Sequence, residues 1–173
     1  MNFITAPDRI HLDTPPKAGP KVFLAGSIEN GAAPEWQQSF RDSPLFITEP
    51  GFFLNPRRRW ITKPSYELLQ EQVFWEQDYL AAADLVVFVF LANTASPITL
   101  LEFGQCIERK VPMVVYCEED YWRRGNVELM LDRQWRLGVS IHQSVSSLPQ
   151  LRNYVFGWIN SWNKQNQHRT VLT

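Results

Sequence analysis

Seven consecutive apolar residues decide the fold of this chain: Leu85-Val86-Val87-Phe88-Val89-Phe90-Leu91. The run shows no alternation between apolar and polar residues, so it does not predict a strand with one face in water. It is typical of a central strand of a parallel sheet, which is buried on both faces. Even when extended to Ala92 it is too short to cross a bilayer, which takes about 20 apolar residues.

Working outward, the sequence alternates between further strand patterns and helix patterns. Strands are predicted at Val22–Ala25, Val111–Cys117 and, as a short edge strand, Val139–His142. Residues 46–54 are apolar but broken by Pro50-Gly51, so they predict either one irregular strand or two short pieces. The predicted helices are Pro34–Arg41, Tyr66–Ala83 with Ser65 as N-cap, Thr99–Arg109, Tyr121–Arg136 and Leu148–Asn163.

This alternation predicts an α/β domain with a parallel sheet of about five strands and helices on both of its faces. The length of 173 residues suits a single domain, which we assign to residues 21–173. Residues 1–20 contain four prolines and little periodicity, so we expect an irregular lead-in there. In such sheets ligands bind outside the carboxyl ends of the strands, which directs attention to the loops after Ala25, Leu54 and Leu91.

Composition excludes several classes of function. The net charge of -1 does not favour a polynucleotide partner. No basic segment followed by an apolar run begins the chain, and the two cysteines lie within or beside apolar runs, so we expect reduced thiols in a cytoplasmic protein that does not bind a membrane. The Cys and His residues lack metal-ligand spacing and no Gly-rich P-loop occurs, so neither a metal nor a cofactor is predicted.

Two carboxylates are candidates for chemistry. Glu102 is expected in the first turn of its helix, where terminal N–H groups favour a negative charge; such a residue often does no more than compensate the helix dipole. In the preceding long helix, position 76 continues the apolar stripe of Leu69, Val73, Leu80 and Ala83, whereas Asp78 points to nearly the opposite side. A carboxylate on an apolar stripe is costly unless it is paired or serves a site, so Glu76 is preferred to Asp78.

The run Arg57-Arg58-Arg59 follows a predicted strand end. Guanidinium groups match the oxygens of a phosphate, so the run is a candidate phosphate site. The alternative is that these arginines form ion pairs that fix an exposed loop.

Five motifs occur in order along the chain. They are residues 22–28, Asn55-Pro56-Arg57-Arg58, Trp75-Glu76 leading to Ala83-Asp84-Leu85, residues 96–104 and Asn126-Val127-Glu128. Together they resemble the nucleoside 2-deoxyribosyltransferase-like family, over roughly residues 21–130. The superfamily also contains deoxynucleoside-monophosphate N-glycosidases. The resemblance implies a flavodoxin-like (Rossmann-like) three-layer sandwich and a homo-oligomer, a dimer or larger.

Position by position, the resemblance implies a role for several side chains. Glu102, in Glu102-Phe103-Gly104, matches the nucleophile, and Glu76 matches an acid that is usually Asp. Ser96 falls where the transferases carry Asp and the monophosphate N-glycosidases a phosphate-binding Ser. Asn126 resembles an Asn that a neighbouring subunit offers to the sugar 5′-hydroxyl, and Phe23 replaces a tyrosine. The predicted substrate-binding set is Gly26, Ser27, Ile28, Asn55, Arg57, Arg58, Ser96, Asn126 and Phe23.

The resemblance implies cleavage of the N-glycosidic bond of a nucleoside or nucleotide by double displacement through a glycosyl-Glu102 intermediate. A free nucleobase as acceptor makes the enzyme a transferase, and water makes it a hydrolase, such as a deoxynucleoside 5′-monophosphate N-glycosidase. A different class is a catalytically inactive nucleotide-binding sensor. Phe23 favours the sensor, because the tyrosine hydroxyl is lost, whereas the retained Glu102 and Glu76 favour an enzyme.

Overall fold

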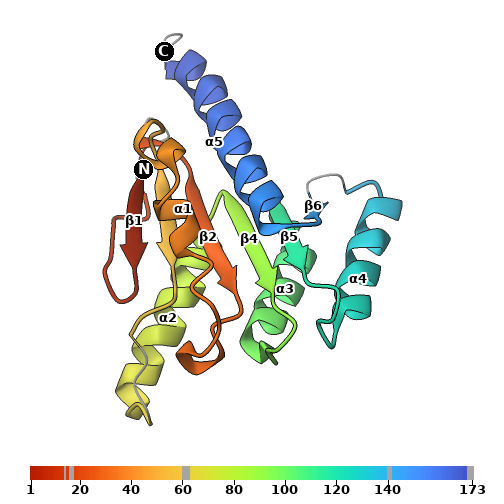
Figure 1. Ribbon diagram of the computed structural model, residues 1–173. Helices are drawn as coiled ribbons and strands as arrows, with labels where there is room; N and C mark the ends of the chain where they lie inside the picture. The colour runs from red at the N-terminus through yellow and green to blue at the C-terminus, as the bar shows by residue number, and fades with distance from the viewer. Residues whose placement is uncertain (14, 16–17, 60–62, 140–141, 171–173) are drawn as a thin grey trace.

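The computed structural model describes the chain apart from residues 14, 16–17, 60–62, 140–141 and 171–173. At its centre lies a sheet of six strands in the order β1-β3-β2-β4-β5-β6 (Figure 1). Every neighbouring pair is parallel. Without β1, this order is that of a flavodoxin-like sheet, as predicted. The strands are β1 (Asn2–Thr5), β2 (Lys21–Gly26), β3 (Phe52–Asn55), β4 (Leu85–Phe90), β5 (Met113–Cys117) and β6 (His142–Val145).

Helices cover both faces of the sheet and complete a three-layer sandwich (Figure 1). One core cluster joins the sheet to α2 (Tyr66–Ala82), α3 (Pro97–Arg109) and α4 (Arg124–Arg136). The other joins its opposite face to α1 (Gln38–Arg41) and α5 (Leu148–Thr170). Two short 3₁₀ helices, η2 (Glu29–Gly31) and η3 (Pro44–Ile47), lie in the loops after β2 and α1. The predicted α/β architecture is therefore confirmed.

Strand β4 shows why its sequence contains no polar residue. Its side chains alternate between the two core clusters: Val86 and Phe88 face α2 and α3, while Val87 and Val89 face α1 and α5. All six residues of the strand are buried. Since water reaches neither face, both faces must be apolar.

The N-terminal segment differs from the irregular lead-in expected over residues 1–20. Asn2–Thr5 forms β1, a parallel edge strand that pairs with β3 from Asn2↔Phe52 to Thr5↔Asn55. Phe3 packs on the rings of Phe46 and Phe53, with centroids 6.3 and 6.2 Å away. The prolines that suggested an irregular segment begin only at position 7, so they leave the first residues free to pair.

Other elements match the sequence with shifted ends. The helix expected from Pro34 is regular only over Gln38–Arg41, and residues 46–54 divide between η3 and β3. The last strand begins at His142 rather than Val139, with residues 140–141 outside the described part, and α5 continues to Thr170.

Both cysteines are free, Cys106 buried and Cys117 half-buried. Within the described residues, no helix combines the length and apolarity that a membrane crossing needs.

Candidate active site

A cavity of about 470 Å³ opens at the carboxyl ends of β2 and β3 and at the start of α3. Its volume lies in the range of small-molecule sites. The walls come from the segment after β2, from residues 56–59 after β3, from one side of α2 and from residues 95–102. It therefore lies where parallel α/β sheets bind ligands. Of the predicted residues, those in its wall are Gly26, Ile28, Arg57, Arg58, Glu76, Ser96 and Glu102.

Glu102 is buried in the wall of this cavity, with 4% of its surface exposed. The expectation that it lies in the first helical turn is wrong, because Pro97 begins α3 and no acidic residue occupies its first turn. Proline suits the first helical position, since its missing N–H has no partner to lose there. Burial, and secondarily the charge of Glu76, raises the pKa of Glu102 to about 8. The site thus holds a carboxyl group that resists ionisation.

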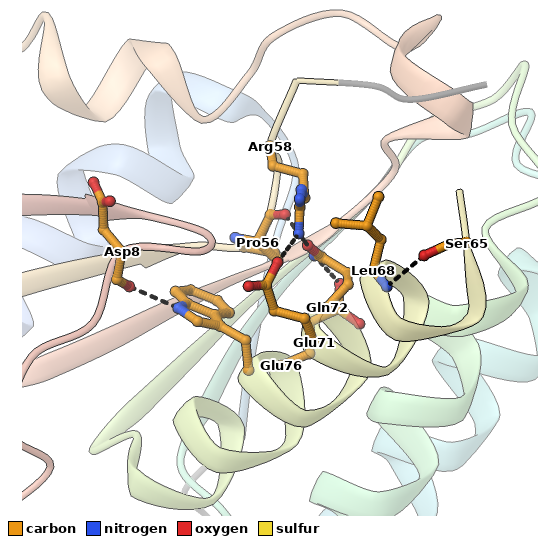
Figure 2. Close-up of polar contacts among 9 residues, drawn as sticks. Asp8, Pro56, Arg58, Ser65, Leu68, Glu71, Gln72 and Glu76 are labelled. Carbon is orange, nitrogen blue, oxygen red and sulfur yellow. Dashed lines mark hydrogen bonds and ion pairs between the residues drawn. The ribbon is translucent and has the colours of Figure 1, made fainter. Parts of the chain in front are cut away.

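Glu76, on α2, also lies in the cavity wall, and Gln72 fixes its side chain (Figure 2). The Gln72 Nε2 group donates to Glu76 Oε1 at 2.7 Å and to the carbonyl of Pro56 at 2.9 Å. Burial raises the pKa of Glu76, and the Gln72 amide opposes the rise. Asp78 is instead exposed and pairs with Arg9 at 3.1 Å, so the structure places Glu76 and not Asp78 in the cavity.

The buried face of α2 is not the stripe read from the sequence. Trp75, Tyr79 and Leu80 are the buried side chains of this helix, whereas Leu69 and Val73 are 50% and 41% exposed. Leu69 and Val73 line the cavity together with Glu76. Part of the predicted apolar stripe therefore lines the cavity instead of the core. This explains why the acidic residue Glu76 occurs on the same side of the helix.

Arg58 does not pair with the acid in the cavity. Its Nη1 group lies 2.9 Å from Glu71 Oε2 and 3.4 Å from Gln72 Oε1 (Figure 2). Gln72 thus stands between the guanidinium and Glu76. Sequence reasoning missed Gln72, although its position four residues before Glu76 on one helix was a usable signal.

Arg57 holds the loop after β2. Its guanidinium donates to the carbonyls of Pro34, Gly31 and Ala33 at 2.8, 3.0 and 2.6 Å. Its backbone N–H donates to Asn55 Oδ1 at 3.1 Å, so Asn55 shapes the turn after β3 and is not in the cavity wall. Both residues fix the frame of the site in this structure.

Three buried hydroxyls support the loop before α3. Ser27, Thr94 and Ser96 lie 2.7 to 2.8 Å from one another. Ser27 Oγ also accepts from the N–H of Leu91 at 3.0 Å, and Thr94 Oγ1 donates to the carbonyl of Leu91 at 2.8 Å. The Ser96 hydroxyl thus forms hydrogen bonds with two other side chains of the protein. Ser27 is fully buried and is not among the residues that line the cavity.

The backbone of this loop is held from both sides by residues that the sequence did not single out. Glu29 Oε2 accepts from the N–H of Ala95 at 2.9 Å and from that of Ser96 at 3.4 Å. The Tyr121 hydroxyl and the Trp122 indole N–H donate to the carbonyl of Ala95 at 3.1 and 3.2 Å. No local sequence pattern marks Glu29, because the contact joins loops 66 positions apart.

The remaining predicted residues occupy different environments. Gly26 lines the cavity, and a Cβ atom there would lie 2.6 Å from the Val89 carbonyl oxygen, so only glycine fits. Phe23 is buried in the core next to Trp75, with ring centroids 6.2 Å apart. Asn126 is exposed on α4, outside the cavity wall. Among the described residues, no group of three or more His, Cys, Asp or Glu side chains is placed to hold a metal ion.

Fold and site together define an α/β protein with the carboxyl groups of Glu76 and Glu102, both with raised pKa values, in the wall of one small-molecule cavity at the ends of parallel strands. The family model described as "Nucleoside 2-deoxyribosyltransferase like" matches residues 19–121, more than half of the chain, and the chain belongs to that family. A crystal structure of a conserved protein from Enterococcus faecalis V583 has a similar fold. The two sequences are 16% identical, and the structures superpose with a TM-score of 0.52. The match covers 79% of this chain and 96% of the Enterococcus protein. The comparison with curated proteins finds no match.

Proposed function

We propose that this protein cleaves the N-glycosidic bond of a nucleoside or nucleotide by double displacement, with Glu102 as nucleophile and Glu76 as general acid and base. The observation that carries the proposal is that the buried carboxyl of Glu102 and the half-buried carboxyl of Glu76 lie in the wall of one cavity. Burial raises the pKa of both acids, and the charge of Glu76 adds to the rise at Glu102, as expected for a carboxyl group that takes part in proton transfer. Membership of the nucleoside 2-deoxyribosyltransferase-like family supports this chemistry.

Because the pKa of Glu102 is about 8, the reaction starts from the fraction of molecules, larger at higher pH, in which Glu102 is ionised, and it also needs a proton on Glu76. The ionised Glu102 then attacks C1′ of the sugar, the C1′–N bond breaks, and Glu76 gives its proton to the departing base. In the second step Glu76 removes a proton from the acceptor, which attacks C1′ and releases Glu102. Transfer results when the acceptor is a free nucleobase, and hydrolysis results when it is water. A cavity that excludes water favours transfer.

The test is a panel of 2′-deoxynucleosides and their 5′-monophosphates, each with and without a free acceptor base, followed by chromatography of the bases. Glu102→Gln should lower turnover by several orders of magnitude. Glu108→Gln is the matched control, because Glu108 is an exposed carboxylate on the same helix. Intact-mass measurement of quenched wild-type enzyme should detect a glycosyl adduct that Glu102→Gln lacks. Near-normal turnover by Glu102→Gln would show that this nucleophile is misassigned.

A second candidate is a nucleotide-binding sensor without turnover. Phe23 favours it, because its ring packs in the core and offers no hydroxyl to the site. Calorimetric binding of a nucleoside or nucleotide, with no base released in the panel, would select the sensor.

We also propose a homo-oligomer located in the cytoplasm. Exposed apolar side chains gather beside the cavity on α2 and α3, namely Leu69, Val73, Phe74, Ile98 and Leu101, and burying them between copies would be favourable. Sedimentation velocity measures the size of the assembly, and a monomer at micromolar concentration would contradict this part.

A further inference from the structure

The cavity wall contains two sets of groups that are suited to bind an anion. One is the pair of backbone N–H groups at Ala95 and Ser96, where α3 begins. The other is the arginine run after β3, Arg57–Arg59. Ser96, just before α3, is six residues from Glu102, about 9 Å at the rise of an α-helix. Both sets line the same cavity as Glu102, so each is a candidate position for the 5′ substituent of a sugar whose C1′ meets Glu102.

Most of these groups are already occupied by the protein itself. The carboxylate of Glu29 accepts hydrogen bonds from both N–H groups at the start of α3. The guanidinium of Arg57 is bonded to three backbone carbonyls, and that of Arg58 pairs with Glu71. Arg59 is exposed and makes no ion pair with a described residue.

The backbone around Glu29 is held in an uncommon conformation. Glu29 and the next residue, Asn30, have φ values of 47° and 55°, in the left-handed region that side chains other than glycine rarely adopt. The carboxylate reaches the start of α3 from this turn, and Arg57 holds the carbonyl of Gly31 just after it. The protein thus fixes a negative charge at the position where α3 would otherwise attract a phosphate.

We propose that Glu29 makes this cavity select an unphosphorylated nucleoside over its 5′-monophosphate. The inference rests on the proposed function and names the substrate class of that same site. A phosphate dianion at the start of α3 would meet the Glu29 carboxylate and find the N–H groups taken. A 5′-hydroxyl carries no charge, and it can donate a hydrogen bond to the same carboxylate. The inference replaces the 5′-phosphate site expected at Ser96, Arg57 and Arg58.

The test compares kcat/KM for each 2′-deoxynucleoside with that for its 5′-monophosphate. Wild type should prefer the nucleoside by about 10- to 100-fold, the range of one charge-assisted hydrogen bond. Glu29→Gln and Glu29→Ala should reduce the preference to within about threefold of unity, mainly by improving the monophosphate. The control is Glu119→Gln, which removes an exposed carboxylate outside the cavity and should leave the ratio unchanged.

Calorimetric titration of the same ligands, and of inorganic phosphate, separates this inference from the proposed function. Without any turnover the proposed function fails, yet tighter binding of the nucleoside to wild type and a gain of phosphate binding in Glu29→Gln would still support the role of Glu29. The inference is overturned if wild type uses or binds the monophosphate equally or better. It is also overturned if both Glu29 variants fold with an unchanged preference, or if neither ligand binds.

Discussion

Replacing Glu102 by glutamine should stabilise the folded protein, and the gain should grow as the pH rises. Burial holds the pKa of this carboxyl at about 8, against an ordinary value of 4.5. In the unfolded chain the group ionises near pH 4.5, while in the folded chain it keeps its proton until about pH 8. Between these values the folded state binds more protons than the unfolded state, so the free energy of unfolding falls as the pH rises.

The size of this effect follows from the two pKa values. They differ by about 3.5, from 4.5 to about 8, and each pH unit between them removes about 1.36 kcal/mol of stability. The wild-type protein therefore loses up to about 5 kcal/mol between pH 4.5 and pH 8 through this group. Glutamine does not ionise, so Glu102→Gln escapes the loss. Part of the shift comes from the charge of Glu76, so this figure already includes the repulsion between the two carboxylates that the variant removes.

The assay is urea denaturation of wild type and Glu102→Gln at pH 5, 7 and 9. We expect nearly equal free energies of unfolding at pH 5 and an advantage of about 2–5 kcal/mol for the variant at pH 9. Glu108→Gln should show no such trend, because Glu108 is exposed. A difference between wild type and Glu102→Gln that stays constant across this range would refute the reasoning from burial.

Three further outcomes are expected. Glu76→Gln should slow base release by about 10²–10⁴-fold through loss of acid–base catalysis, whereas Asp78→Asn should change it less than about twofold; equal losses would contradict the assignment. Gln72→Leu removes the amide that lowers the pKa of Glu76, so the alkaline limb of the kcat/KM profile should move to higher pH, and an unmoved limb would exclude this role. Arg57→Ala should lower the free energy of unfolding by about 2 kcal/mol by freeing the loop carbonyls, while Arg59→Ala should leave it unchanged; similar values for both would argue against the anchor.

The layers of the fold could be predicted from the pattern of apolar residues, because that pattern depends directly on which faces of each element are buried. The run in β4 lacks polar residues since both faces of the strand are covered. Strand β1 could not be read in this way, because it is four residues long and only partly buried. Its pairing depends on the edge of β3 being open, which is a property of the assembled sheet.

Helical phase located Glu76, but it did not show what the stripe faces. Leu69 and Val73 share that side of α2, and they line a cavity rather than the core. Periodicity reports which side chains lie together, and it does not distinguish a core from the wall of a ligand site. The position of Glu102 was misread for another reason: Pro97 can begin a helix, so the first turn begins two residues before the predicted start at Thr99 and ends before Glu102.

The sequence left open whether the arginines bind a phosphate or fix a loop, and it could not decide for Arg57, because the partners of its guanidinium are mostly backbone groups. Arg57 binds three carbonyls of a loop that follows a different strand, and backbone carbonyls are the same in every sequence. A run of three arginines therefore indicates charge without indicating whether that charge is free. Only the folded loop shows that the guanidinium of Arg57 is already hydrogen-bonded to the protein's own carbonyl groups.

Among the described residues, no cation forms an ion pair with Glu76 or Glu102, and this has a chemical consequence. An arginine paired directly with Glu76 would lower the pKa of that carboxyl and leave it ionised, which would suit structure but not acid catalysis. The protein has a guanidinium close by, in Arg58, yet Glu71 takes it at 2.9 Å, and the neutral Gln72 separates it from Glu76. Buried acids without a cationic partner destabilise a fold. Their arrangement around one cavity is therefore better explained by proton transfer to and from a ligand than by the stability of the fold.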